Sequence, residues 1–354
     1  MSIPEGVIPP KPTQVCKLEK SLYGLKQASR QLNARLSIEL ISLGYIQSFI
    51  DHSLFTKQNH DSFTAFLVYV DDIVLDGNDM IEIQDVKGHL DNLFRIKDLG
   101  PLRFFLGFEV AHSQRGILLN QRKYTLELLS DGGLTGAKHV STPMEPTLRL
   151  CQNQGAPYHE SAANRRLVRR LLYLTNTRPD ISFTVQQLSQ FVAHPTKPHF
   201  DAAIRVLKYL KRSPGKGIFF PSHNSLTLSG FTDADWATCP DTRKSTTGFY
   251  VFIRSSLITW KSKKQSIVSR SSAEVEYRAL ATLTCEVQWL TYLLHDLHIP
   301  ISGPAMIYNN NQAAIHLAHN LTFHEHDNNI ELDCHITREK IIKGLIHLLH
   351  VSTK

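Results

Sequence analysis

Hydrophobic residues recur at two different spacings along the first hundred or so residues. Leucines three, four or seven positions apart run from Ser21 to Leu43 and predict a helix with one apolar face. A strand pair, a second helix and a hairpin are predicted to follow, at residues 66–75, 81–94 and 104–119. Helices interspersed with short antiparallel strands in this order are typical of an α+β domain.

A second pattern begins after residues 132–160, which are rich in glycine and proline and are predicted to be a linker. Three short helical runs follow it, at residues 167–174, 181–192 and 200–210. The remaining runs read as three strands, a long helix, a strand, two helices and a last strand, at residues 226–236, 247–253, 257–261, 272–294, 305–308, 312–318, 333–343 and 345–351. This order predicts a mixed α/β sheet with helices.

Composition places the chain among globular proteins with more than one domain. It has 354 residues, of which 42% are hydrophobic and 20% are charged. We predict three parts, at residues 1–131, 132–222 and 223–354. The five cysteines are scattered without CxxC spacing, which favours a reducing compartment. With neither a signal peptide nor a membrane-spanning run in the sequence, we expect a cytoplasmic or nuclear protein that is not secreted.

Basic residues exceed acidic ones by 39 − 32 = 7. An excess of this size suits a polyanion-binding surface without requiring one. Much of it lies in three clusters, at residues 165–170, 208–216 and 261–264. Solvated helix faces and loops are the alternative interpretation of each cluster.

Two adjacent carboxylates, Asp71 and Asp72, interrupt an apolar strand-like run. An unpaired buried carboxylate is costly, so the pair predicts a compensating partner. Paired carboxylates that hold a divalent metal are how many phosphoryl-transfer enzymes activate an attacking oxygen. The two flanking strands would place the acids at a hairpin tip, within reach of solvent and substrate. A polar turn that merely breaks the strands is the other interpretation.

Two further acids stand out in the last part of the chain. The predicted helix over residues 272–294 has an apolar stripe that, extended back by one turn, reaches Glu276, whereas Glu274 continues toward Arg278. Asp233 lies on the first predicted strand of this part. A carboxylate on a packing face needs a metal or a cationic partner. The alternative for Glu276 is an acid in the first turn, favoured by the helix dipole.

Short motifs in a fixed order cover nearly the whole chain, at residues 21–30, 67–72, 97–100, 105–107, 121–124, 141–144, 177–181, 232–236, 260–265, 271–279 and 311–314. In this order they resemble the Pol polyprotein of copia-type LTR retrotransposons. The resemblance covers the later half of reverse transcriptase, a connection region and ribonuclease H. It implies an incomplete right-hand polymerase, with palm and thumb, followed by a ribonuclease H-like mixed sheet.

The resemblance also implies a chemistry and the residues that perform it. In this family both activities use two magnesium ions, one for the nucleophile and one for the leaving oxygen. The partner would be nucleic acid, as a template–primer or an RNA/DNA hybrid, with no membrane involved. The implied metal-binding and catalytic residues are Asp71, Asp72, Asp233 and Glu276. The implied substrate-binding residues are Lys26, Gln27, Arg30 and Lys97, of which Lys97 would lie near the triphosphate.

Departures from the family pattern concern the metal ligands. The third acid of the palm is expected upstream of the first motif found here. The third acid of the ribonuclease H site falls at Asn310, an amide that keeps the shape of aspartate but loses its charge. The fourth is expected on a last helix beyond Lys354. These departures predict a truncated copy with weakened Mg²⁺ binding that catalyses neither reaction efficiently.

Two other hypotheses are compatible with the sequence. A longer precursor or a partner chain can supply the missing acids, in which case the polymerase and ribonuclease H would be active. Alternatively, the chain binds nucleic acid through its basic clusters without catalysis. An intact reading frame on both flanks would favour the first of these, and binding to nucleic acid that falls steeply with salt would favour the second.

Overall fold

The computed structural model describes residues 27–222, 226–320 and 331–352. The chain divides into two compact units, Met1–Gly100 and Pro101–Lys354. The predicted division into three parts, with boundaries at 131 and 222, stays a prediction.

The first unit is an antiparallel four-stranded sheet, in the order β1-β2-β3-β4, packed against two helices. Its elements are α1 (Ala28–Ser42), β1 (Ile46–Gln47), β2 (Leu54–Asn59), β3 (Ser62–Tyr69), β4 (Asp72–Gly77) and α2 (Met80–Phe94). Leu36 and Leu40 of α1 and Val86 and Leu90 of α2 are buried in its core. The predicted strand pair and second helix are confirmed, whereas the start of the first predicted helix, residues 21–26, lies outside the described residues.

The second unit begins with an antiparallel sheet, in the order β5-β6-β7-β8, and a group of helices. Their bounds are β5 (Phe104–Phe105), β6 (Phe108–Ser113), β7 (Gly116–Asn120), α3 (Arg122–Asp131), α4 (Ser161–Leu174), η1 (Pro179–Ile181), α5 (Ser182–Ser189), α6 (Lys197–Leu210) and β8 (Ile218–Pro221). The predicted hairpin, linker and three helical runs are confirmed. The sequence did not reveal α3 or β8, and β8 pairs with β7 across about a hundred residues of chain.

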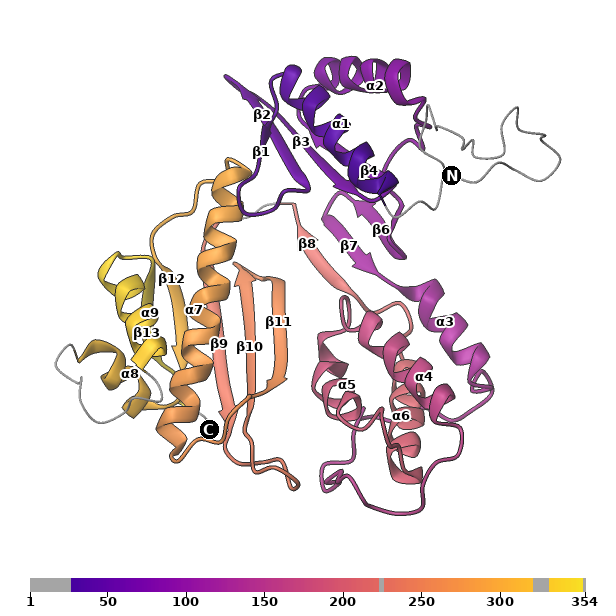
Figure 1. Cartoon of the computed structure of the whole chain (residues 1–354), viewed down its shortest axis with the longest axis vertical. Helices are drawn as coiled ribbons and strands as arrows, with labels where there is room; N and C mark the ends of the chain where they lie inside the picture. The colour runs from indigo at the N-terminus through magenta and orange to yellow at the C-terminus, as the bar shows by residue number, and fades with distance from the viewer. Residues whose placement is uncertain (1–26, 223–225, 321–330, 353–354) are drawn as a thin grey trace, which may run out of the picture. The chain divides into compact units, whose positions relative to one another are not determined.

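A five-stranded mixed sheet forms the rest of the second unit (Figure 1). Its elements are β9 (Leu228–Asp235), β10 (Thr246–Ile253), β11 (Ser256–Lys264), α7 (Ser272–Asp296), β12 (Ala305–Asn309), α8 (Gln312–His319), α9 (Glu331–Ile342) and β13 (Ile346–His350). The strand order is β11-β10-β9-β12-β13, with β9 to β11 antiparallel and β12 parallel to both of its neighbours. Every strand and helix predicted for this part is present.

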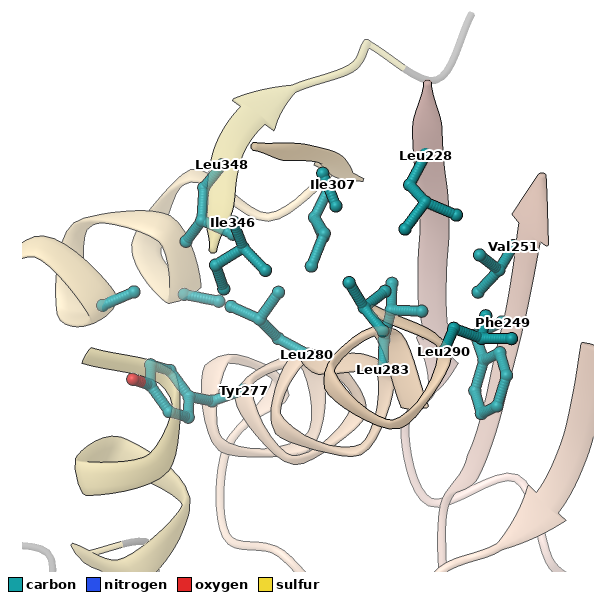
Figure 2. Packing of buried hydrophobic residues seen from close by; sticks show 14 of the residues in the cluster. Leu228, Phe249, Val251, Tyr277, Leu280, Leu283, Leu290, Ile307, Ile346 and Leu348 are labelled. Atoms are coloured by element: carbon teal, nitrogen blue, oxygen red, sulfur yellow. The ribbon is translucent and has the colours of Figure 1, made fainter. Parts of the chain in front are cut away.

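Helix α7 packs its apolar stripe against this sheet. Figure 2 shows Leu280, Leu283 and Leu290 of the helix facing Leu228 and Ile307 of the strands, all of them buried. Gly230 of β9 permits this close approach, because an added Cβ would meet the Leu283 methyl groups at 3.1–3.2 Å. The packing fixes the rotation of α7 about its axis, and with it the direction in which Glu276 points.

The predicted mixture of α+β and α/β architecture is therefore present at the level of sheets and helices. No helix within residues 27–222, 226–320 and 331–352 is both long enough and apolar enough to cross a membrane.

Candidate functional site

Asp71 and Asp72 lie where β3 turns into β4, after Tyr69 and at the start of β4. Both strands are labelled in Figure 1. Tyr69 pairs with Asp72 across the turn, and Val70 has a left-handed backbone with φ of 52°. Both carboxylates are exposed, and neither has a hydrogen bond or an ion pair within the described part of the chain. Water can therefore compensate their charge, so these carboxylates do not require a bound cation between the strands.

The residues predicted to bind substrate are exposed in the same unit. Gln27 precedes α1, Arg30 lies in its first turn, and Lys97 lies in the loop after α2. Among the described residues, none of the three forms a hydrogen bond or an ion pair with the Asp71–Asp72 pair. Lys26 lies outside the described residues.

In the second unit, Asp233 of β9 and Glu276 of α7 meet at one end of the sheet. The N–H of Ala234 donates to Asp233 Oδ1 at 2.9 Å and contacts Glu276 Oε1 at 3.2 Å, so both carboxylates share one backbone donor. Glu276 is 6% exposed, as its place on the apolar stripe predicts. Glu274 instead accepts a hydrogen bond from Arg278 at 2.9 Å, on the side predicted for it.

Two asparagines from the end of β12 complete this constellation. Asn309 is buried, and its Nδ2 donates to Glu276 Oε2 at 3.1 Å. The N–H of Asn311 donates to Asn309 Oδ1 at 2.7 Å, which fixes the direction of the Asn309 amide. Asn310 Nδ2 donates to Asp233 Oδ1 at 3.3 Å. Each carboxylate therefore has its own side-chain amide donor.

Sequence reasoning identified Asp233, Glu276 and Asn310 but missed Asn309. The signal was present in the alternation of β12, because Ala305, Ile307 and Asn309 share one face of the strand. The first two are buried on the side of α7, so the third had to be buried there as well. Asn311, the third asparagine of the run, caps α8 by accepting a hydrogen bond from the N–H of Ala314 at 3.0 Å.

The surroundings of Glu276 shift its protonation equilibrium. Burial raises its pKa, the hydrogen bond from Asn309 lowers it, and the negative charge of Asp233 raises it again. The net effect raises the pKa of Glu276 from 4.5 to about 7. Near neutral pH the folded protein therefore holds a proton on this carboxyl for much of the time, unlike the unfolded chain.

This shift predicts that the second unit loses stability as the pH rises. Above about pH 5 the unfolded chain is ionised at this position, whereas the folded protein loses its proton only near pH 7, and at a cost in free energy. Between about pH 5.5 and about pH 7.5 the free energy of unfolding should fall by about 2 kcal/mol relative to the Glu276→Gln variant. Urea unfolding of both proteins at several pH values measures this difference in the free energy of unfolding.

Glu274→Gln is the matched control, because it neutralises an acid on the same helix and should leave the Glu276-dependent slope in place. If the free energy of unfolding falls with pH equally in the unchanged protein and in Glu276→Gln, the pKa of Glu276 is not raised by folding.

The residues around Asp233 and Glu276 do not fit the magnesium site that the resemblance to ribonuclease H implies at this place. A divalent cation needs oxygen ligands, whereas Asn309 and Asn310 turn their N–H groups toward the two carboxylates. Within the described parts of both units, no three histidine, cysteine, aspartate or glutamate side chains are grouped closely enough to hold a metal ion.

The basic clusters differ in how many of their side chains form hydrogen bonds or ion pairs within the described part of the chain. Lys211 donates to the carbonyl oxygens of Thr135 and Ala137, and Lys216 pairs with Asp180 at 3.2 Å. On α4, by contrast, three arginines are exposed and form no ion pair with any described residue: Arg165, Arg166 and Arg169.

Comparison with known proteins identifies the family. Residues 1–146 match the family described as reverse transcriptase (RNA-dependent DNA polymerase). The retrovirus-related Pol polyprotein from transposon RE1 of Arabidopsis thaliana is 41% identical over 354 residues, the whole of this chain. The chain belongs to the copia-type Pol polyproteins of transposons. A second such Pol polyprotein, from transposon TNT 1-94 of Nicotiana tabacum, is 34% identical over the whole chain.

The chain spans about a quarter of the length of these Pol polyproteins, 24% and 27% respectively. An uncharacterised mitochondrial protein of Arabidopsis thaliana is 40% identical over 223 residues, which are 63% of this chain and 92% of that protein. Among solved structures, a foamy viral protease-reverse transcriptase in complex with dsDNA aligns with 94% of this chain and 60% of its own. That alignment has 13% sequence identity and a TM-score of 0.49.

Proposed function

We propose that this Pol-family chain is a reverse transcriptase and ribonuclease H fragment. Residues 1–131 would supply palm and thumb, residues 132–222 the connection, and residues 223–354 a ribonuclease H-like domain. The hairpin with Asp71 and Asp72 at its tip and the Asp233–Glu276 pair support this assignment. The partner we propose is nucleic acid, as a template–primer or an RNA/DNA hybrid.

We further propose that the ribonuclease H-like site of this chain is catalytically impaired. The observation that carries this proposal is the pair of amide donors, Asn309 on Glu276 and Asn310 on Asp233. Two carboxylates repel one another less when amide N–H groups compensate them and one, Glu276, holds a proton, so the site needs no cation to offset its charge. The same compensation removes the driving force for binding Mg²⁺, which two-metal hydrolysis requires.

Binding without cleavage is the outcome that the structure favours. The exposed arginines Arg165, Arg166 and Arg169 of α4 have no acidic partner among the described residues, so they remain available to phosphate groups. A chain that retains these residues and lacks a working metal site would hold nucleic acid without hydrolysing it.

Both proposals are tested together by incubating the purified chain with Mg²⁺ and a labelled RNA/DNA hybrid, and measuring binding by gel shift and cleavage of the RNA strand. We expect a gel shift that weakens as salt is raised, and weakens further in an Arg165→Gln/Arg169→Gln variant. We expect no cleavage above that of Asp233→Asn. Robust cleavage that Asp233→Asn abolishes would overturn the proposal of impairment. The absence of a shift at low salt would overturn the proposal of binding.

A further inference from the structure

A polar cavity lies where the helical part of the second unit meets edge strand β11, outside the sites described above. Its volume is about 340 Å³. The helical part contributes Asn176, Ser182 and Gln186 to its lining, and β11 contributes Trp260 and Lys261. None of these residues belongs to the Asp233–Glu276 site.

Several polar groups around this cavity have no hydrogen-bond partner among the described residues. Ser182 Oγ is buried without a hydrogen bond. The side-chain amides of Asn176 and Gln186 form no hydrogen bond with any described residue. Ser182 Oγ is buried and Gln186 is half-buried, whereas Asn176 is exposed. Buried or half-buried polar groups are normally satisfied, so the unsatisfied Ser182 and Gln186 indicate a missing polar ligand.

Trp260 gives the cavity a fixed aromatic wall. Its Nε1–H donates to the carbonyl oxygen of Thr175 at 3.1 Å, which holds the edge of the indole against the helical part. The indole is half-buried and lines the cavity. A ring held in this way can stack with a planar ligand without first losing rotational freedom.

The described lining of the cavity carries one positive charge. Lys261 is exposed and forms no ion pair with the described residues, and it carries the single formal charge among the described residues that line the cavity. An anionic group at the mouth would therefore meet a cation among the lining residues, while the neighbouring Glu286 carboxylate accepts a hydrogen bond from Thr259 at 2.9 Å.

We propose that this cavity binds one nucleotide, with its base against Trp260 and its phosphate at Lys261. The amides of Asn176 and Gln186 each offer a donor and an acceptor, which is the combination found along the edge of a nucleobase. Aromatic side chains that stack on bases are the usual means by which proteins hold unpaired nucleotides. The nucleotide can be a free mononucleotide or an unpaired position of a strand.

Calorimetric titration of the full chain with AMP and with UMP tests the proposal. A short single-stranded oligonucleotide and adenosine serve as separate arms. We expect Trp260→Leu to weaken AMP or oligonucleotide binding by about tenfold, the scale of one lost base-stacking contact. Gln186→Ala should weaken it by up to about tenfold, through the lost hydrogen bonds to the base. Lys261→Gln should weaken the binding of AMP but not that of adenosine, because adenosine lacks the phosphate.

Trp289→Leu is the matched control, because Trp289 is an exposed tryptophan on α7 and does not line this cavity. Dependence on Trp260 seen with the oligonucleotide alone would identify a strand as the source of the nucleotide. Gln186→Ala keeps the test valid if Trp260→Leu fails to fold. The proposal is overturned if neither AMP, UMP nor the oligonucleotide binds, or if the cavity variants bind as tightly as Trp289→Leu. Asp233→Asn should not alter this binding, so its outcome is separate from that of the cleavage assay.

Discussion

Replacing Asn310 with aspartate is expected to make the stability of the second unit depend on divalent metal. The change removes the amide that donates to Asp233 at 3.3 Å and puts a third negative charge beside Asp233 and Glu276. In EDTA the variant should lose about 1 kcal/mol of unfolding free energy, through one lost hydrogen bond and added repulsion. With Mg²⁺ or Mn²⁺ the loss should reverse, because three carboxylates form a site for a hard cation.

Thermal unfolding with and without metal measures whether Asn310→Asp destabilises the protein in EDTA and stabilises it with metal. Calorimetry measures the binding of the metal itself. We expect Asn310→Asp to bind Mn²⁺ at least about tenfold more tightly than the unchanged chain, and its unfolding temperature to rise with metal concentration. Asn311→Asp is the matched control. It adds the same charge one residue further on, and aspartate still caps α8 there. If both variants respond to metal alike, general electrostatic attraction explains the effect and Asn310 has no special place.

The described elements from β9 to β13 were predictable in detail because most of them are strongly patterned. The stripe through Leu280, Leu283 and Leu290 determined which face of α7 packs on the sheet, and the position of Glu276 followed from it. Local periodicity was sufficient here, since the sheet buries the face that the sequence makes apolar.

Elements whose stability comes from distant partners were not predictable in this way. Strand β8 has four residues, and it exists because β7, nearly a hundred residues earlier, offers an edge to pair with. The contact of Asn309 with Glu276 likewise joins residues 33 positions apart and depends on how β12 lies beside β9. A single sequence contains no local signal for the pairing of β7 with β8, and the alternation of β12 predicts that Asn309 is buried but not that it contacts Glu276.

The burial of Arg178, which belongs to the family motif at residues 177–181, also depends on distant partners and has no local signal in the sequence. Arg178 is 1% exposed and holds Asp180 through two hydrogen bonds, from Nε and Nη2, each of 2.9 Å. Its Nη1 donates to the carbonyl oxygen of Ser213 at 3.0 Å. Although burial raises the pKa of Asp180, the hydrogen bonds and charge of Arg178 outweigh it and lower that pKa to about 2.

Replacing Arg178 with methionine should therefore be among the most damaging changes in the chain. It leaves the Asp180 carboxylate largely buried without its main cation, at a cost of about 3–5 kcal/mol in the free energy of unfolding measured in urea. Lys216→Met removes the half-exposed second cation of the same carboxylate and should cost less than about 1 kcal/mol. Adding Asp180→Asn to Arg178→Met should recover part of the loss, because no buried charge then remains. A cost for Arg178→Met no greater than that of Lys216→Met would show that water, not Arg178, compensates the carboxylate.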